Sequence, residues 1–183
     1  APLANGTYDL ITASTFSGSA SDFLLTVNSG INSRQSAAVV LNGSNIAISV
    51  NGDTPKWTGA VNGNWTTSTI SSPKNWKLIT ANTATDFLAL DNVLFDDTAT
   101  GTTALELSDG DIAAGVIQFN NSSKNYSISS TANYFITQGS LVKNGTGTLT
   151  IATSNTFNAA TTFSGGRLHL ENSGALGGDR KSV

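Results

Sequence analysis

The sequence of 183 residues contains no cysteine and no methionine, and its single histidine is His169. The absence of cysteine excludes disulfides, thiol chemistry and cysteine-ligated zinc. A Ser/His/Asp triad would need His169, and no G-x-S-x-G sequence is present to supply its nucleophile. Because His169 alternates with Leu168 and Leu170 in "RLHL", we expect its imidazole to face solvent.

Charged residues are also scarce, at 11% of the chain against roughly 25% in an average soluble domain. The net charge is -3 and the nine Lys and Arg are scattered, so we expect no binding to nucleic acid. No apolar run reaches the roughly 18 residues of a membrane span, so we expect no membrane insertion by this segment. The N-terminal "APLANGTYDL" has no signal-peptide pattern and no initiating Met. We therefore interpret the chain as a processed piece of a longer protein.

Thr, Ser, Asn and Gly dominate instead, and the first three compete with a helical backbone for hydrogen bonds. This composition predicts an all-β protein. The turn-forming "NGDTP" at 51–55 predicts a boundary, with a β-strand segment over 1–54 and a second unit over 55–183. "NGSN" at 42–45 lies between β-branched runs and predicts a hairpin turn, so a small antiparallel part is expected before the boundary.

After residue 104, short apolar pairs recur with Gly or Asn between them, more densely than in an antiparallel sandwich. Strands this short, with a period of about 20 residues, predict a parallel β-helix, also called a β-solenoid. The inward-facing Leu, Ile, Val and Phe side chains are expected to form its stacked core. The recurring apolar positions are Leu105, Leu107, Val116, Ile117, Phe119, Tyr126, Ile128, Phe135, Ile136, Leu141, Val142, Leu149, Ile151, Phe157, Phe163, Leu168 and Leu170.

One stretch carries a family resemblance: "GSLVKNGTGTLTIATSNTFNAATTFSGGRLHLENSGALG" at 139–177. It resembles the autotransporter-associated β-strand repeat, or passenger-associated transport repeat. The positions that match the repeat pattern are Leu141, Lys143, Gly145, Gly147, Thr148, Leu149, Thr150, Asn155, Thr156, Phe157, Thr161, Thr162, Gly166, Leu168, Ala175, Leu176 and Gly177. Ala159 and Ala160 depart from it, because the family has glycine there. Residues 57–138 resemble, more loosely, the segments that precede such repeats, and residues 1–54 look like the tail of an upstream unit.

The resemblance implies a right-handed parallel β-helix that is secreted and exposed on the bacterial cell surface. It further implies a non-catalytic passenger or stalk segment whose stacked repeats assist export, with no cofactor. Because each coil contacts only its neighbours, such a protein can fold progressively as it emerges from the membrane. Its exposed end strands would also allow self-association.

An alternative function rests on the three tryptophans, Trp57, Trp65 and Trp76. Aromatic faces stack on sugar rings, so these side chains could form a platform for a polysaccharide or a host surface, as in an adhesin. Their irregular spacing also fits packing in a core or cap. Both interpretations stay open at this point.

The acidic stretch "DNVLFDD" contains Asp91, Asp96 and Asp97. These carboxylates can accept hydrogen bonds from turn amides, Asp96 and Asp97 can ligate calcium, or a pair can hydrolyse a polysaccharide in a β-helix enzyme. "LSDGD", with Asp109 and Asp111, predicts a turn, since it lacks the downstream Glu of an EF-hand. No catalytic residue and no metal site are assigned from these patterns.

Overall fold

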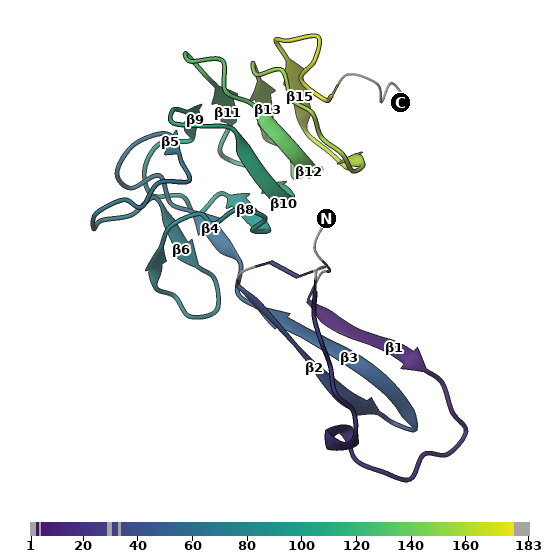
Figure 1. The fold of residues 1–183 in the computed structure, drawn as a ribbon. Helices are drawn as coiled ribbons and strands as arrows, with labels where there is room; N and C mark the ends of the chain where they lie inside the picture. The colour runs from purple at the N-terminus through teal and green to yellow at the C-terminus, as the bar shows by residue number, and fades with distance from the viewer. Residues whose placement is uncertain (1–2, 4, 29–30, 33, 178–183) are drawn as a thin grey trace. The chain divides into compact units, whose positions relative to one another are not determined.

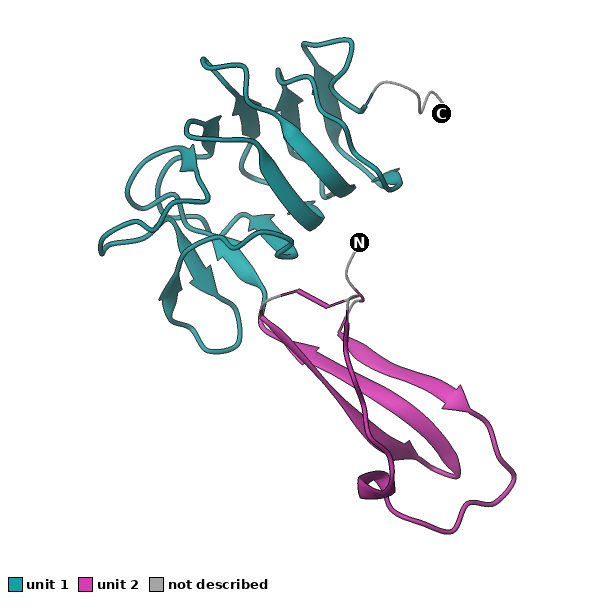
Figure 2. Ribbon diagram, viewed as in Figure 1, with its two compact units in different colours: residues 1, 54–183 teal, residues 2–53 magenta. Residues whose placement is uncertain are grey.

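The computed structural model describes residues 3, 5–28, 31–32 and 34–177. The fold is all-β, as the composition predicts, and the one helix in the described residues is the 3₁₀ turn η1 (Ala20–Asp22). No helix in these ranges is long and apolar enough to cross a membrane. The chain divides between Asp53 and Thr54 into two compact units, unit 1 over 54–183 and unit 2 over 2–53, which Figure 2 colours separately.

Unit 2 is a three-stranded antiparallel sheet in the order β1-β3-β2. Its strands are β1 (Gly6–Ile11), β2 (Gln35–Asn42) and β3 (Asn45–Gly52). The predicted hairpin turn is confirmed, because Asn42 pairs with Asn45 across two residues, and Gly43 has a φ of 64° that glycine adopts readily. A groove of about 230 Å³ lies on this unit between the sheet and the segment around Leu25 and Val27.

The described part of unit 1, residues 54–177, contains twelve strands in two sheets, with the orders β14-β12-β10-β8-β4-β6-β7 and β15-β13-β11-β9-β5 (Figure 1). Their bounds are β4 (Pro55–Trp57), β5 (Asn64–Trp65), β6 (Trp76–Leu78), β7 (Ala84–Thr85), β8 (Val93–Asp96), β9 (Ala104–Leu107), β10 (Ile112–Asn120), β11 (Tyr126–Ser129), β12 (Ile136–Asn144), β13 (Thr148–Ile151), β14 (Thr161–Phe163) and β15 (Arg167–Leu170).

From β8 onward the chain alternates between the two sheets, and every pairing is parallel. Side chains on adjacent strands contact residues 23 to 25 positions away through the middle of the unit. Toward the C-terminal strands this interval shortens to 19. Each strand from β8 to β13 therefore lies between the strands that occupy the same place before and after it, whereas β14 and β15 pair on one side in the described residues.

The core of unit 1 follows the two-residue alternation of its strands. Burial alternates along β10, β11, β12 and β13, and the inward side chains form one cluster from Trp57 to Ala175. Phe95, Phe119, Lys143 and Phe163 are in register across the seven-stranded sheet, and of these Phe95 and Phe119 belong to the cluster. The rings of Phe95 and Phe119 stack with centroids 4.4 Å apart and planes at 9°.

Five of the recurring apolar positions are not fully buried. Phe163 is 51% exposed and Leu170 is 41% exposed, because β14 and β15 each pair on one side only. Val116 and Val142 are half-buried, since their side chains alternate with fully buried neighbours on the same strands, and Phe135 is half-buried just before β12 begins. Leu168 packs partly against the core.

Candidate functional site

The three tryptophans come from three different strands and meet in one aromatic cluster. Trp57 and Trp65 are fully buried and Trp76 is 2% exposed. The rings of Trp57 and Trp76 meet edge to face with centroids 5.0 Å apart, and Phe95 contacts all three indoles. Packing in a core is therefore confirmed. The glycan platform placed on these residues is corrected, because no indole face is open to a sugar ring.

The indole N–H groups show how tightly the cluster is enclosed. Trp57 Nε1 donates to the Thr102 carbonyl at 2.8 Å, whereas the Nε1 atoms of Trp65 and Trp76 are buried without a hydrogen-bond partner. The close approach behind Trp57 requires glycine, since a Cβ at Gly59, whose φ is 60°, would collide with the Thr102 carbonyl.

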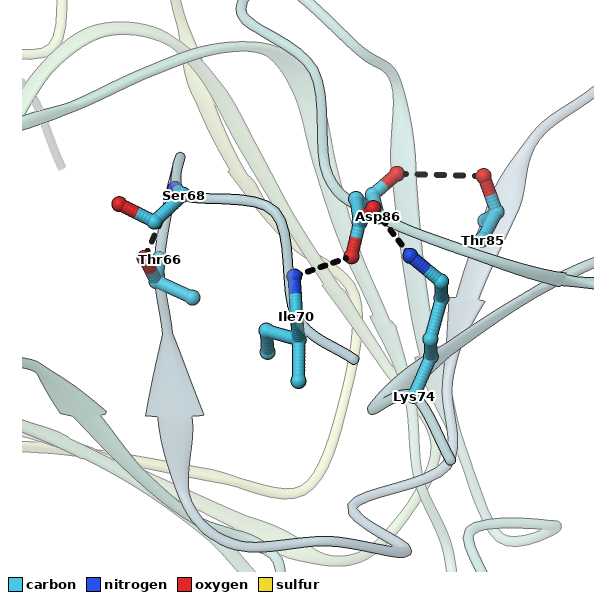
Figure 3. A network of polar contacts seen from close by, with 6 residues as sticks. All are labelled: Thr66, Ser68, Ile70, Lys74, Thr85 and Asp86. Carbon is cyan, nitrogen blue, oxygen red and sulfur yellow. Dashed lines mark hydrogen bonds and ion pairs between the residues drawn. The ribbon is translucent and has the colours of Figure 1, made fainter. Parts of the chain in front are cut away.

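A polar network borders the aromatic cluster, and Figure 3 shows it around Asp86. The Asp86 carboxylate accepts the Ile70 N–H at 3.1 Å and pairs with the Lys74 ammonium, while Thr85 donates to the Asp86 carbonyl at 3.3 Å. Nearby, Thr66 Oγ1 accepts the Ser68 N–H at 2.9 Å. The Asp86 carboxylate therefore connects the segment after β7 to the loop between β5 and β6. The sequence composition did not indicate this role.

Asp97 caps a turn of the next repeat. Its carboxylate accepts the backbone N–H groups of Ser122, Ser123 and Lys124 at 2.9–3.0 Å. The Lys124 N–H, followed by those of Ser122 and Ser123, holds the pKa of Asp97 below its usual value. The interpretation of Asp97 as a turn acceptor is confirmed.

The other acidic candidates are also engaged in local contacts. Asp91 is buried and accepts the Leu88 N–H at 2.8 Å, and Asp96 accepts the Thr98 N–H at 2.8 Å and lies 3.9 Å from Lys56 Nζ. Asp109 accepts the Thr66 hydroxyl.

Asp111 accepts the Phe135 N–H at 3.1 Å. Within the described ranges, no three His, Cys, Asp or Glu side chains gather as metal ligands would. The arrangement around Asp96 and Asp97 therefore offers turn capping rather than an open carboxylate pair for calcium or hydrolysis.

Lys143 of the repeat motif is fully buried, which is unusual for lysine. Its ammonium donates to three carbonyl oxygens, those of Asn144 at 2.7 Å, Gly145 at 3.1 Å and Gly165 at 3.4 Å. Burial lowers the pKa of Lys143. Because the Gly165 acceptor belongs to the next repeat, this side chain joins two consecutive turns.

Three buried asparagines act as bridges between backbone segments. Asn155 Oδ1 accepts the Ile136 N–H at 2.9 Å, and its Nδ2 donates to the Ala175 carbonyl at 2.8 Å. Asn75 and Asn121 make comparable bonds, and nothing in the sequence distinguishes them from the many turn asparagines. These amides replace backbone pairing where the chain leaves a strand.

The remaining motif residues pack in the core, lie close to the backbone of a neighbouring turn, or form hydrogen bonds with it. Leu141 and Leu149 are fully buried, Phe157 is 5% exposed, and Leu176 and Leu168 pack against the core. A Cβ at Gly145, Gly147 or Gly166 would collide with the neighbouring turn, and Gly177 has a φ of 88°. Thr148 accepts an Asn121 bond through its carbonyl, and Thr156 Oγ1 donates to the Thr137 carbonyl at 2.9 Å.

The predicted exposure of His169 is confirmed, since its side chain is 57% exposed, and its Nδ1 lies 3.7 Å from Glu171 Oε1. His169 is on β15, far in sequence from the acidic candidates. No family model, curated protein or solved structure matches this chain.

Proposed function

We propose that this chain is a non-catalytic structural segment of a secreted, autotransporter-like bacterial surface protein. In this proposal unit 1 is a right-handed parallel β-solenoid made of autotransporter-associated β-strand repeats. The observation that supports it best is the parallel register of strands β8 to β15, in which paired strands are equivalents one repeat apart. Crossovers between parallel strands of one sheet are right-handed in about 98% of cases.

The roles of the polar side chains support a structural function. Lys143 and Asn155 connect successive repeats, and Asp97 caps the turn that follows it by one repeat. Each of these groups is used in holding the chain to itself. A stalk or passenger needs such connections, whereas an enzyme needs carboxylates that are free to reach a substrate.

Nearest-neighbour packing also gives a physical reason for export. A repeat of this kind gains most of its buried contacts when the adjacent repeat is already in place, so folding can proceed one repeat at a time. Folding outside the cell would then oppose backward movement through the outer membrane. On this basis we propose that the chain acts at the bacterial cell surface.

An export assay tests this function. The chain would be fused ahead of an autotransporter translocator in a bacterium, and the exposed fraction measured by protease accessibility. Leu149→Asp places a charge in the core, so we expect surface exposure to fall several-fold, with a smaller fall for the half-buried Leu168→Asp.

Thr150→Asp is the matched control, since Thr150 lies next to Leu149 on the same strand but is half-exposed. Equal export of all variants would contradict the proposal. Specific retention of the unchanged chain on an immobilised polysaccharide would instead favour a binding function.

A further inference from the structure

Five asparagines of this chain are followed by glycine, and in such a pair the backbone nitrogen of the glycine can attack the asparagine side chain. The pairs are Asn5–Gly6, Asn42–Gly43, Asn51–Gly52, Asn62–Gly63 and Asn144–Gly145. Glycine favours this attack because it has no side chain to hinder the approach. The asparagine backbone must also rotate until the two atoms meet, so the surrounding structure decides which pair reacts.

Two of these pairs are held by the sheet of unit 2. Asn5 Nδ2 donates to the Gly52 carbonyl at 2.6 Å, and Asn5 Oδ1 accepts a hydrogen bond from Gln35 at 3.0 Å. Asn51 and Gly52 lie on the central strand β3, where they pair with Ser36 and Gln35. Rotation at Asn51 would break the ladder between β3 and β2, so we expect both pairs to react slowly.

Two further pairs are held in unit 1. Asn62 Oδ1 accepts the Asn64 N–H at 2.9 Å and the Asn75 amide at 2.8 Å, so the Asn62 side chain is fixed away from ring closure. The Asn144 carbonyl accepts the buried Lys143 ammonium at 2.7 Å. Because that carbonyl moves when the Asn144 backbone rotates, ring closure there would leave a buried charge without one of its partners.

The remaining pair, Asn42–Gly43, lies at the tip of the β2–β3 hairpin. Asn42 is exposed, is the last residue of β2, and pairs with Asn45 across the two-residue loop of Gly43 and Ser44. The N–H of the first residue in such a loop takes no part in the ladder. No atom of the described residues lies within 4 Å of a Cβ built on Gly43. Rotation at Asn42 therefore opens only the last pair of the hairpin, where local opening costs least.

We propose that Asn42 is a modification site, at which the side-chain amide is lost by spontaneous deamidation. The Gly43 nitrogen attacks Asn42 Cγ, so an N–Cγ bond forms, the Cγ–Nδ2 bond breaks, and the Gly43 amide proton leaves with the side-chain nitrogen as ammonia. Water then adds to one carbonyl carbon of the cyclic imide and opens the ring. The product is aspartate or isoaspartate at this position, and water is the only co-reactant.

The modification changes a polar contact that joins all three strands of unit 2. The Asp9 carboxylate on β1 accepts the Asn42 amide at 2.9 Å and the Asn45 amide at 2.8 Å. Asn45 Oδ1 in turn accepts the Ala13 N–H at 3.2 Å. Deamidation replaces the Asn42 donor with a second carboxylate beside Asp9, and like charges this close repel each other. The contact between β1 and the hairpin is therefore weakened.

Peptide mapping by mass spectrometry tests the site, and it does not depend on the export function. The 183-residue chain is incubated at mildly alkaline pH, folded or unfolded in urea, and conversion at the five pairs is followed with time. We expect similar rates at all five pairs in urea, and conversion several-fold faster at Asn42 than at the other four in the folded chain. Gly43→Ala should slow conversion at Asn42. Equal rates at all five pairs in the folded chain, or no conversion at Asn42, would overturn the proposal.

Amide hydrogen exchange of β1, measured by NMR, tests the consequence. Asn42→Asp reproduces the aspartate product, so we expect several-fold faster exchange than in the unchanged chain. The double variant Asp9→Asn/Asn42→Asp restores one amide and one carboxylate with their positions exchanged, and exchange should return to its original rate. Asn51→Asp is the matched control, because the Asn51 amide donates to the Ser49 hydroxyl rather than to a carboxylate. Equal effects of the two single aspartate variants, or no recovery in the double variant, would overturn this consequence.

Discussion

The two ends of unit 1 differ in how the parallel sheets are closed. At the N-terminal end, β4 pairs with β6 and β6 with β7, both antiparallel, and the three tryptophans fill the space behind them. At the C-terminal end, β14 and β15 leave Phe163 and Leu170 exposed. In the described residues the sheets have edge strands at both ends, β7 and β5 at one and β14 and β15 at the other, so the ends differ in the burial of their large apolar side chains.

This difference explains why residues of one type behave differently along one column. Phe95 contacts three tryptophans, Phe119 and Tyr126, whereas Phe163 occupies the equivalent register position with half its surface in water. The repeat supplies the same inward position each time, but burial depends on the presence of a neighbour on both sides.

The largest predicted effect is a loss of stability at the N-terminal end of unit 1. Phe95→Ala removes the ring that contacts all three indoles, so we expect a loss of about 3–5 kcal/mol in the free energy of unfolding. Guanidinium unfolding followed by tryptophan fluorescence measures it, because the variant keeps all three reporters. Phe163→Ala is the matched control at the open end, and we expect a loss below about 1 kcal/mol. Equal losses would show that the two ends are packed alike.

The next prediction concerns a turn near the open end. Gly166 has a φ of 80°, and a Cβ there would collide with the carbonyls of Gly145 and Gly147. We expect Gly166→Ala to cost about 2–4 kcal/mol, from the backbone conformation and the collision together. Gly43→Ala is the control, since Gly43 also has a positive φ but no atom within 4 Å of the added Cβ.

For Gly43→Ala the conformational cost alone applies, at about 1–2 kcal/mol. Urea unfolding monitored by circular dichroism compares the two variants with the unchanged chain. A loss no larger for Gly166→Ala than for Gly43→Ala would mean that the turns between repeats can separate freely, and the open end would then be less ordered than its hydrogen bonds indicate.

The sequence predicted which residues of a strand are buried better than it predicted which segments that strand packs against. Alternation in "TLTI" correctly indicated that Leu149 and Ile151 are buried, because this pattern is local. Core or cap packing of the tryptophans was one of two interpretations that the sequence left open, since Trp57, Trp65 and Trp76 lie on three strands and converge only after long-range pairing.

Lys143 and Asp97 show the same limit at the candidate site. Lys143 matched the repeat pattern, but its burial depends on an acceptor 22 residues later. Asp97 gave an acidic signal, but its three N–H donors lie 25 to 27 residues away. Local patterns therefore identified residues that matter, whereas their chemistry depends on what the following repeat brings beside them.

The third prediction compares a buried asparagine with an exposed one within the repeats. Asn155→Ala removes a buried amide that bonds to Ile136 and Ala175, and leaves their backbone groups without partners, so we expect a loss of about 2–3 kcal/mol. Asn144→Ala, which removes the exposed Asn144–Asn120 bond at 2.9 Å, should cost about 0.5–1 kcal/mol. Thermal unfolding of both variants measures the difference, and equal costs would assign no special role to the buried bridge.

The smallest predicted effect depends on pH. The pKa of Asp97 is lowered in the folded chain, chiefly by the Lys124 N–H. A carboxyl whose folded pKa lies below its unfolded value contributes stability above the unfolded pKa, and that contribution disappears as pH falls through the folded pKa. Asp97→Asn should therefore reduce stability at pH 6 and flatten the acid-side slope of unfolding free energy below about pH 5. Asp22→Asn, in the 3₁₀ turn of unit 2, is the comparison variant. The Asp22 carboxylate accepts the Ser19 N–H, whereas Asp97 accepts three backbone N–H groups. Parallel losses of stability by Asp97→Asn and by the unchanged chain on acidification would contradict this prediction. They would show that the three N–H groups do not stabilise the Asp97 carboxylate, and that packing and the Asn121 side chain maintain the turn after β10.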